Sequence, residues 1–298
     1  MYEFSSAPRQ QPLPTMYDLP SEAVGEPGLP DEFHRMQAEL LRETCCSPKY
    51  SGGKFSPEDA SDANQSSLFI ASDLNLYYDS RNPEWYKRPD WFLCLDVPKL
   101  KQQKDLRWSY LIWQEQVAPF LAIEFLSPGT EAEDLGKTVR RIDQPPRKWE
   151  VYERFLRIPY YALYDRYDNK FRLFQLSGTK YQEVQLRGDR VWFNELELGL
   201  AIWPGRYEEA DGQWLRWYDA NNQWVPTELE RAEQAEAQIE TERERAEQAE
   251  AQIETERERA EQAEAQIETE RERAEQAELN YQALLKKLEQ QGLDVNDL

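Results

Sequence analysis

The sequence predicts an α/β fold in which a mixed β-sheet is flanked by helices and followed by a long C-terminal helix. Two apolar runs, 91–95 and 120–126, are rich in Leu, Ile and aromatic residues and are typical of strands buried on both faces. A helical pattern over residues 31–44 precedes them, and a 14-residue repeat occupies the C-terminal part of the chain. Together these patterns favour a layered α/β domain with a helical appendage.

We expect the chain to have three parts. Residues 1–20 are polar and contain several prolines, which predicts a flexible arm. Residues 21–226 hold nearly all of the aromatic side chains and are numerous enough to bury one sizeable core. Residues 227–298 consist mostly of the charged repeat, which predicts a single helix or a weak coiled coil.

The net charge of −21 is distributed unevenly along the chain. Residues 228–298 contain 22 acids and 9 bases, whereas residues 1–227 contain 35 acids and 27 bases. Even the first part therefore lacks the strongly basic surface of a tight nucleic-acid-binding protein. Any binding to DNA must use a local patch of basic residues.

The first helix is predicted to begin at Asp31, a capping residue that follows Pro30. Its apolar face is formed by positions spaced close to 3.6 residues apart: Phe33, Met36, Leu40 and Thr44. His34 is the only histidine and lies outside that face, so we expect it at the surface or behind a site rather than in catalysis. A single histidine also leaves little material for a Ser-His-Asp triad. Glu39 lies on the polar face, where solvation is its expected role, although it could reach a metal site if this helix packs against the edge of the sheet.

Two acidic residues are notable because the predicted buried strands carry them. Glu124 lies inside an apolar run, where an ionised carboxylate costs several kcal/mol unless a partner compensates it. Asp90 directly follows Pro89 and precedes the other run. A hard cation such as Mg²⁺, shared by Asp90 and Glu124, would relieve their repulsion and bring water to the site. In the alternative interpretation, Asp90 only begins a strand and Glu124 pairs with an arginine.

The two acids belong to a series of motifs, which are Pro-Asp at 89–90, Ile-Glu-Phe-Leu-Ser-Pro at 123–128, Asp-Leu-Gly at 134–136 and Lys-x-x-x-Tyr at 148–152. In this order they resemble the Uma two restriction-endonuclease-like family, a branch of the PD-(D/E)XK nucleases, over about residues 16–226. The resemblance implies a restriction-endonuclease-like mixed β-sheet core. It also implies an endonuclease that hydrolyses phosphodiester bonds of DNA, with Mg²⁺ or Mn²⁺ held by Asp90 and Glu124.

The lysine of the usual motif is displaced in this sequence. That motif has a lysine two residues after the glutamate, where this chain has Leu126. The resemblance places the lysine on the following helix, where Lys148 matches best and Lys137 is the alternative. Basic residues crowd this region and could form a DNA-binding patch or a solvated helix face: Lys137, Arg140, Arg141, Arg147 and Lys148.

Several further elements are predicted around the acid-bearing strands. Residues 68–78 and 106–115 alternate in polarity and predict strands, the second forming a hairpin with 120–126. Residues 147–156 are predicted to be helical, with Tyr152 pointing inward.

The second half of the domain is predicted to consist of strands bounded by turn signals. These strands cover 160–165, 171–176, 181–186, 191–193 and 196–204. A small Trp-rich hairpin is predicted over 214–226, with Asn221 and Asn222 at its turn. We expect this hairpin to cover an exposed edge of the sheet.

The repeat predicts a helix with a poor coiled-coil seam. In heptad register, one column alternates Ala and Ile, as at Ala232 and Ile239, while its companion column has a glutamate at every second position, as at Glu242. Pairs such as Glu240 with Arg243 contribute about 0.2–0.5 kcal/mol each to helix stability. The helix is predicted to pair only weakly, so homo-oligomerisation and a solvated single helix are both compatible with it.

Three cysteines without metal-binding or disulfide spacing favour a reducing, cytoplasmic location. No stretch approaches the roughly 20 apolar residues of a membrane span, and the first residues lack the pattern of a secretory signal. We therefore expect a cytoplasmic protein without membrane contact. The hypothesis that competes with the enzyme is an inactive protein that keeps the nuclease fold and assembles through its tail.

Overall fold

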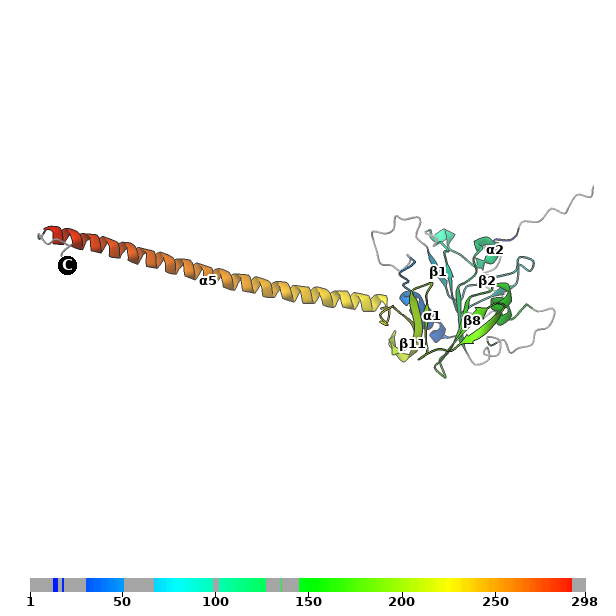
Figure 1. The fold of residues 1–298 in the computed structure, drawn as a ribbon. Coiled ribbons are helices and arrows are strands. Elements are labelled where there is room, and N and C mark those ends of the chain that lie inside the picture. Colours follow the sequence, from blue (N-terminus) through cyan, green and yellow to red (C-terminus); the bar gives the residue numbers. More distant parts are fainter. Residues whose placement is uncertain are drawn as a thin grey trace, which may run out of the picture. The chain divides into compact units, whose positions relative to one another are not determined.

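The computed structural model describes residues 13–15, 18, 31–50, 67–98, 102–126, 135 and 145–290. The chain divides into two compact units, Met1–Glu228 and Leu229–Leu298, here called the α/β unit and the tail. The α/β unit contains three sheets and several short helices, and the tail is helical (Figure 1). The predicted fold class, a restriction-endonuclease-like mixed sheet with a long C-terminal helix, is confirmed.

The largest sheet contains both acid-bearing runs at its centre. Its strands are, in spatial order, β1 (Leu68–Ala71), β4 (Trp91–Leu95), β6 (Leu121–Leu126), β7 (Tyr160–Asp165), β8 (Lys170–Ser177) and β9 (Lys180–Val184). β6 runs antiparallel to β4 and parallel to β7, and the other neighbours are antiparallel. The sheet is mixed, as the sequence predicted.

The central strands are apolar because both faces of this sheet are covered. The odd-numbered residues of β6 belong to one core cluster, and Ala122 and Leu126 belong to the other. Side chains alternate between the faces of a strand, so Glu124 points to the same face as Ala122 and Leu126. That face also holds the buried Tyr152.

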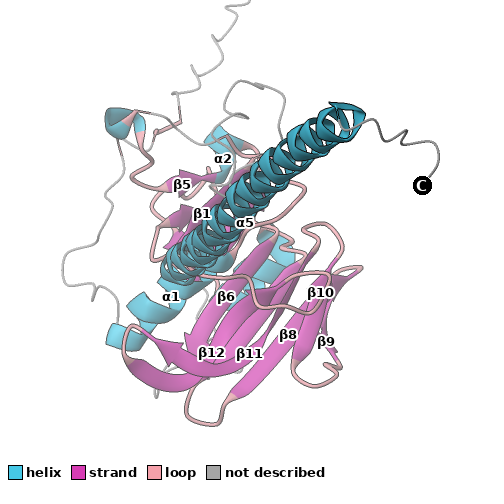
Figure 2. Cartoon of the chain, turned by 90° about the vertical axis from the view of Figure 1, so that its left-hand side faces the viewer, coloured by secondary structure: helices cyan, strands magenta, loops and turns pink. Residues whose placement is uncertain are grey.

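An antiparallel sheet covers the opposite face. Its strands are β10 (Arg190–Phe193), β11 (Leu198–Tyr207) and β12 (Ala210–Tyr218). Figure 2 shows β11 and β12 as a long curved hairpin, with α1 (Glu32–Thr44) against β12. Leu200, Trp217 and Leu41 pack with Trp91 of β4 in one buried cluster, which fixes this layer on the large sheet.

α1 has the predicted start and the predicted buried face. The Asp31 carboxylate accepts a hydrogen bond from the backbone N–H of His34 at 3.2 Å, which satisfies one of the free donors at the helix start. Met36, Leu40 and Thr44 are buried, as their spacing predicted.

The face that holds Glu124 is covered by a short helical segment, at the position of the helix predicted over 147–156. One helical turn, α4 (Lys148–Glu150), continues directly into a π-helix, Val151–Phe155. Tyr152 is fully buried there. A single π-helical turn is rare and frequently lies at a functional site.

The strand predicted over 68–78 is wrong, because the chain leaves the large sheet after β1. The following strand, β2 (Leu76–Tyr77), pairs with β3 (Tyr86–Lys87) and β5 (Tyr110–Leu111) in a separate small sheet. The break lies at Asp73, whose φ of +51° is in the left-handed region that interrupts a strand.

The strand predicted over 106–115 and its hairpin with 120–126 are also wrong. The segment contains only the short β5 and then the helical turn α2 (Ile112–Glu115), after a 3-10 turn at Gln103–Asp105. α2 ends at Gln116, which has a left-handed φ of +59°. The edge of β6 that the hairpin would occupy is taken by β7, a more apolar strand.

The predicted Trp-rich hairpin is partly wrong. Trp214–Tyr218 belongs to β12, and its partner is β11 rather than the segment that follows it. The predicted turn at Asn221 and Asn222 is present, but it closes only one bridge, between Tyr218 and Trp224. Burial of Trp217 in the main core explains the preference for β11.

The tail is one continuous helix, α5 (Glu228–Gln290), of 63 residues. The single long helix predicted from the repeat is therefore confirmed. Its side chains are almost all exposed. Within the described part of the chain, no helix is both long enough and apolar enough to span a bilayer.

Several predicted features lie outside the described residues. These are the N-terminal arm up to residue 12, the motif residues Ser127, Pro128, Asp134 and Gly136, and the basic residues Lys137, Arg140 and Arg141.

Candidate active site

Glu124 lies at the centre of the large sheet and has no solvent exposure. Its strand is buried because apolar residues flank the acid on both sides, so the local sequence forces the carboxylate inside. An isolated buried carboxylate would be strongly unfavourable, and its hydrogen bonds must compensate for the lost hydration.

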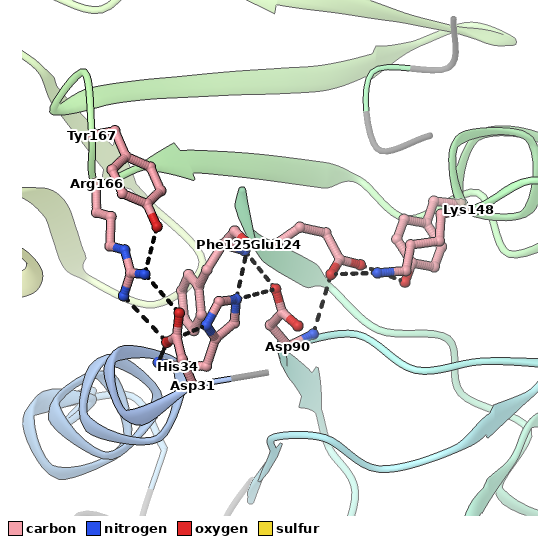
Figure 3. Close-up of polar contacts among 9 residues, drawn as sticks. Asp31, His34, Asp90, Glu124, Phe125, Lys148, Arg166 and Tyr167 are labelled. Atoms are coloured by element: carbon pink, nitrogen blue, oxygen red, sulfur yellow. Dashed lines mark hydrogen bonds and ion pairs between the residues drawn. The ribbon is translucent and has the colours of Figure 1, made fainter. Parts of the chain in front are cut away.

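At least three groups donate hydrogen bonds to the Glu124 carboxylate, and Figure 3 labels two of them, Lys148 and Asp90. Lys148 Nζ lies 2.9 Å from Oε2, and the backbone N–H of Asp90 lies 3.3 Å from the same oxygen. The Tyr152 hydroxyl donates to Oε1 at 2.8 Å. Both ends of the carboxylate are therefore held, and the lysine balances its charge.

Asp90 immediately precedes β4 and reaches across to β6. Its Oδ2 accepts a hydrogen bond from the backbone N–H of Phe125 at 2.6 Å. The two strands thus exchange contacts, because each acid accepts a hydrogen bond from the backbone of the other strand. The Asp90 side chain is 18% exposed, and its Oδ1 accepts no hydrogen bond from the residues that the structure describes.

Lys148 and Tyr152 approach Glu124 from the same helical segment. Lys148 lies in α4 and Tyr152 in the π-helix, four residues later, so both side chains can lie on one face. The Lys148 side chain is 21% exposed, whereas Tyr152 is fully buried. The lysine therefore connects the buried acid with solvent.

His34 lies behind Asp90, on α1. Its Nε2 is 3.1 Å from the carbonyl oxygen of Phe125 and 3.9 Å from Asp90 Oδ2. Its Nδ1 is 2.8 Å from the Asp31 carboxylate. Both ring nitrogens face acceptors, and both hydrogen bonds form together only when both nitrogens carry hydrogen.

Arg166 completes this side of the site. It forms an ion pair of 2.6 Å with Asp31, and its Nη2 donates a hydrogen bond to the Tyr167 hydroxyl at 2.7 Å. Burial alone raises the pKa of Asp31, but hydrogen bonds from His34 and Arg166 outweigh it and leave that pKa below its ordinary value. Asp31 thus remains a charged acceptor that links Arg166 to His34.

The structure brings together the three residues predicted for catalysis, Asp90, Glu124 and Lys148. Glu124 forms an ion pair with Lys148. The surface position considered for His34 is wrong, because His34 is buried behind Asp90. Glu39 is half-buried and forms no hydrogen bond or ion pair with either acid.

The sequence did not predict that Tyr152, Asp31 and Arg166 contact the residues of this site. For Tyr152 a signal was present, because a Lys-x-x-x-Tyr spacing on a helix places both side chains on one face. For Arg166 no local signal exists, since Asp31 lies 135 residues away and only the fold joins them.

The donor set suits a hard cation better than a soft one. Asp90 and Glu124 supply oxygen ligands, and Oδ1 of Asp90 accepts no hydrogen bond from the described residues. The described residues contain no group of three or more His, Cys, Asp or Glu side chains placed to hold an ion. Mg²⁺ usually binds through one or two carboxylates and keeps several waters, whereas structural Zn²⁺ needs four protein ligands. Asp90 and Glu124 therefore supply the type of ligand, carboxylate oxygen, that Mg²⁺ and Mn²⁺ prefer.

Residues 58–203 match the family model Uma2, whose description is "Putative restriction endonuclease". This range includes Asp90, Glu124, Lys148 and Tyr152 but neither α1 nor the tail. No curated protein matches the chain.

Proposed function

Since residues 58–203 of this chain belong to the Uma2 family, and since Asp90, Glu124 and Lys148 converge in one site, we propose that the protein is a metal-dependent endonuclease. The reaction would be hydrolysis of phosphodiester bonds in DNA. The observation that carries the proposal is the exchange of hydrogen bonds between Asp90 and β6 and between Glu124 and β4, which brings two acids from neighbouring strands to one place.

Asp90 and Glu124 are the residues that would hold Mg²⁺ or Mn²⁺. When bound, such an ion supplies a more acidic water and neutralises charge on the phosphate. Glu124 is fixed in orientation by Tyr152 and Asp90, so its oxygens need no rearrangement before a substrate arrives.

Lys148 is proposed to stabilise the negative charge that develops on the phosphate group during attack by water. Its ammonium lies beside the acids and is partly exposed, so a phosphate could approach it from solvent. A cation held in a site that is largely shielded from water stabilises such charge far better than one in bulk solvent. Lys137, the alternative lysine, lies outside the described residues.

One observation favours the competing function, an inactive nuclease-fold protein that acts through interactions. The ion pair between Lys148 and Glu124 satisfies the buried acid without any ion. In that case Lys148 would be a structural partner of Glu124, and Asp90 would only fix the start of β4.

The two functions differ in a cleavage assay. The purified full chain is incubated with plasmid and with single-stranded DNA in the presence of Mg²⁺ or Mn²⁺. We expect cleavage by the wild type and a loss of at least about 100-fold in Glu124→Gln, Asp90→Asn and Lys148→Met. Lys137→Met tests the alternative lysine and is expected to keep activity.

A second lysine-glutamate pair gives a matched control. Lys180 lies 3.0 Å from the buried Glu153, close to the 2.9 Å between Lys148 and Glu124. Lys180→Met removes a similar ion pair outside the proposed site and is expected to leave cleavage intact. Cleavage that is equal in wild type and Glu124→Gln would exclude Glu124 from the reaction, and no cleavage by the folded wild type on either DNA would support the inactive protein.

A further inference from the structure

The tail helix α5 presents its largest apolar side chains to solvent. Ile239, Ile253 and Ile267 are 65%, 65% and 64% exposed, and the repeat places them 14 residues apart. Near the C-terminal end of the helix, Tyr281 and Leu284 are each 56% exposed. A single exposed isoleucine needs no explanation, but a regular row of them along one helix indicates a contact surface.

These side chains recur in a heptad pattern along α5. Positions seven residues apart drift by about 20° around a straight helix, and a left-handed supercoil of two helices removes this drift, so that they form one continuous column. The first column contains Ala232, Ile239, Ala246, Ile253, Ala260, Ile267, Ala274, Tyr281 and Leu288. Its companion column, three residues further on, contains Ala235, Glu242, Ala249, Glu256, Ala263, Glu270, Ala277 and Leu284. Two such columns form the seam of a coiled coil.

The residues that flank this seam complement those of a second copy of the chain. In a parallel pair of helices, the residue directly before the first column lies near the residue five positions later on the other helix. Arg231 then meets Glu236 of the second copy. The repeat produces the same combination at three further places: Arg245 with Glu250, Arg259 with Glu264, and Arg273 with Glu278. The intervening pairs combine glutamine with arginine, as in Gln238 with Arg243, so no like charges meet.

Other arrangements keep less of this complementarity. In an antiparallel pair the column that holds Arg231 and Gln238 faces itself, and it contains no acid over the whole repeat. A parallel pair shifted by seven residues brings Arg231 opposite Arg243. A shift of 14 residues keeps the charges but separates Tyr281 and Leu284 from their equivalents, which only the unshifted register brings together.

The glutamates of the companion column weaken the seam, but an arginine accompanies each of them. Each is followed directly by an arginine in the flanking column, as Glu242 is by Arg243. In a parallel pair that arginine lies beside the glutamate of the other helix, which offsets the repulsion between the two acids. These layers reduce affinity and favour one register, as a polar residue in a seam commonly does.

We propose that α5 is a dimerisation surface whose partner is α5 of a second copy, in a parallel, unshifted two-stranded coiled coil. The exposed column and the flanking charges of α5 support this dimer, which does not depend on the nuclease function. Because the pair is parallel, both chains enter it from the same end.

Light scattering during size-exclusion chromatography of the full chain tests the association. We expect a mass near twice the 35.3 kDa of one chain. A triple variant with Ile239→Asn, Ile253→Asn and Ile267→Asn should dissociate at least tenfold more readily. The matched control replaces exposed alanines on the opposite face, Ala237→Ser, Ala251→Ser and Ala265→Ser, and should stay dimeric. Circular dichroism checks that both variants remain helical, and a wild type that is monomeric at all concentrations would overturn the proposal.

Cysteine cross-linking tests the orientation. Ala235→Cys and Ala277→Cys each place a thiol in the companion column, near opposite ends of the repeat. With diamide as the oxidant, each variant alone should form a disulfide-linked dimer in a parallel pair. Failure of both variants to form a disulfide-linked dimer, while light scattering shows a dimer, would exclude the parallel, unshifted pair and contradict the proposal. The wild type is the background control, because Cys45 and Cys94 are buried and Cys46 is partly buried.

Charge reversal tests the flanking contacts. One variant changes the arginines at 231, 245, 259 and 273 to glutamate, and the other changes the glutamates at 236, 250, 264 and 278 to arginine. Each alone should dissociate at least tenfold more readily, and an equimolar mixture should recover the dimer. Unchanged association of both single variants would show that these charges do not form the interface.

Discussion

Glu124 in the α/β unit and Glu242 in the tail are the same residue type under opposite conditions. Glu124 has no solvent exposure, and three fixed donors surround its carboxylate. Glu242 is exposed on a helix whose sequence repeats every 14 residues. The first carboxylate is held by partners that only the folded sheet brings together, whereas the second lies on a helix that forms without the sheet.

The difference shows what a buried charge demands of the sequence around it. Burying Glu124 is tolerable only because Lys148, Tyr152 and the backbone of Asp90 replace its hydration. Such an arrangement does not add much stability over a well-packed apolar residue, so its presence points to chemistry. In the tail, charged side chains keep a long helix solvated and, in the proposed dimer, select its partner. Replacing a single one of them should change stability little.

Removing the Glu124 side chain should lower the free energy of unfolding of the α/β unit more than any substitution in the tail. Glu124→Ala leaves the Tyr152 hydroxyl and the Lys148 ammonium without their acceptor, and we expect a loss of about 3–5 kcal/mol in the free energy of unfolding. All ten tryptophans lie between residues 85 and 224, so tryptophan fluorescence during urea unfolding reports the α/β unit alone.

The matched tail variant is Glu242→Ala. Its fluorescence transition should agree with the wild type within about 0.5 kcal/mol, because exposed substitutions away from a packed site have small effects. A loss below about 1 kcal/mol in Glu124→Ala would mean that the buried acid is not held as tightly as its hydrogen bonds indicate.

Glu153 allows the buried and the exposed glutamates to be compared through the pH dependence of stability. Burial by itself raises the pKa of Glu153, but hydrogen bonds from the Tyr181 backbone and from Lys180 outweigh it and lower that pKa below its ordinary 4.5. A depressed folded pKa adds stability that is present above the unfolded pKa and is lost as the pH falls through the folded pKa. The unfolded chain binds more protons in this window, so stability rises with pH.

Glu153→Gln should therefore flatten the dependence of unfolding free energy on pH below about pH 4.5. One proton contributes at most about 1.4 kcal/mol per pH unit. Urea titrations between pH 3 and pH 6, followed by fluorescence, measure the slope. The slope should not vanish, because the pKa of Asp31 is also lowered and titrates in the same direction. Identical slopes in the variant and the wild type would mean that Glu153 is as well solvated as an exposed acid.

Variants of Tyr152 and Tyr181 distinguish a role in orienting the site from a role in stabilising the fold. Each hydroxyl donates one hydrogen bond, Tyr152 to Glu124 at 2.8 Å and Tyr181 to the Ile158 carbonyl at 2.9 Å. Changing either to phenylalanine should cost about 1 kcal/mol of stability. Only Tyr152→Phe is expected to lower DNA cleavage, because only this bond orients a proposed metal ligand. Equal cleavage by both variants would remove Tyr152 from the orientation of Glu124.

The same contrast explains what the sequence could and could not predict. β4, β6 and β7 were predictable because continuous apolar runs have few alternatives to a buried strand. The convergence of Asp90, Glu124 and Lys148 was predicted through ordered motifs rather than through periodicity. The tail was predictable because a repeat fixes its own helix.

The misassigned segments depend on contacts that are distant in the sequence. Residues 106–115 fit a strand by alternation, but the edge of β6 was already taken by β7. His34 is polar and lies three residues after Asp31. Nothing in the local sequence therefore indicates that it is buried and contacts the Phe125 carbonyl, 91 residues away. A single π-helical turn such as Val151–Phe155 has no sequence pattern of its own, because five residues do not establish a period.

The smallest expected effect belongs to the ion pairs within the tail. Arg257 lies 3.2 Å from Glu261, four positions later, and both side chains are about two-thirds exposed. Arg257→Gln should change helix stability by about 0.2–0.5 kcal/mol, and the difference should shrink in 1 M salt, because exposed pairs are screened. Thermal melting followed by circular dichroism at low and high salt measures this, with Gln262→Asn as a control on the same turn. A loss of helix stability above about 1 kcal/mol that does not depend on salt would mean that Arg257 has a partner shielded from water. The tail would then contain a shielded ion pair, as the α/β unit does at Lys148 and Glu124.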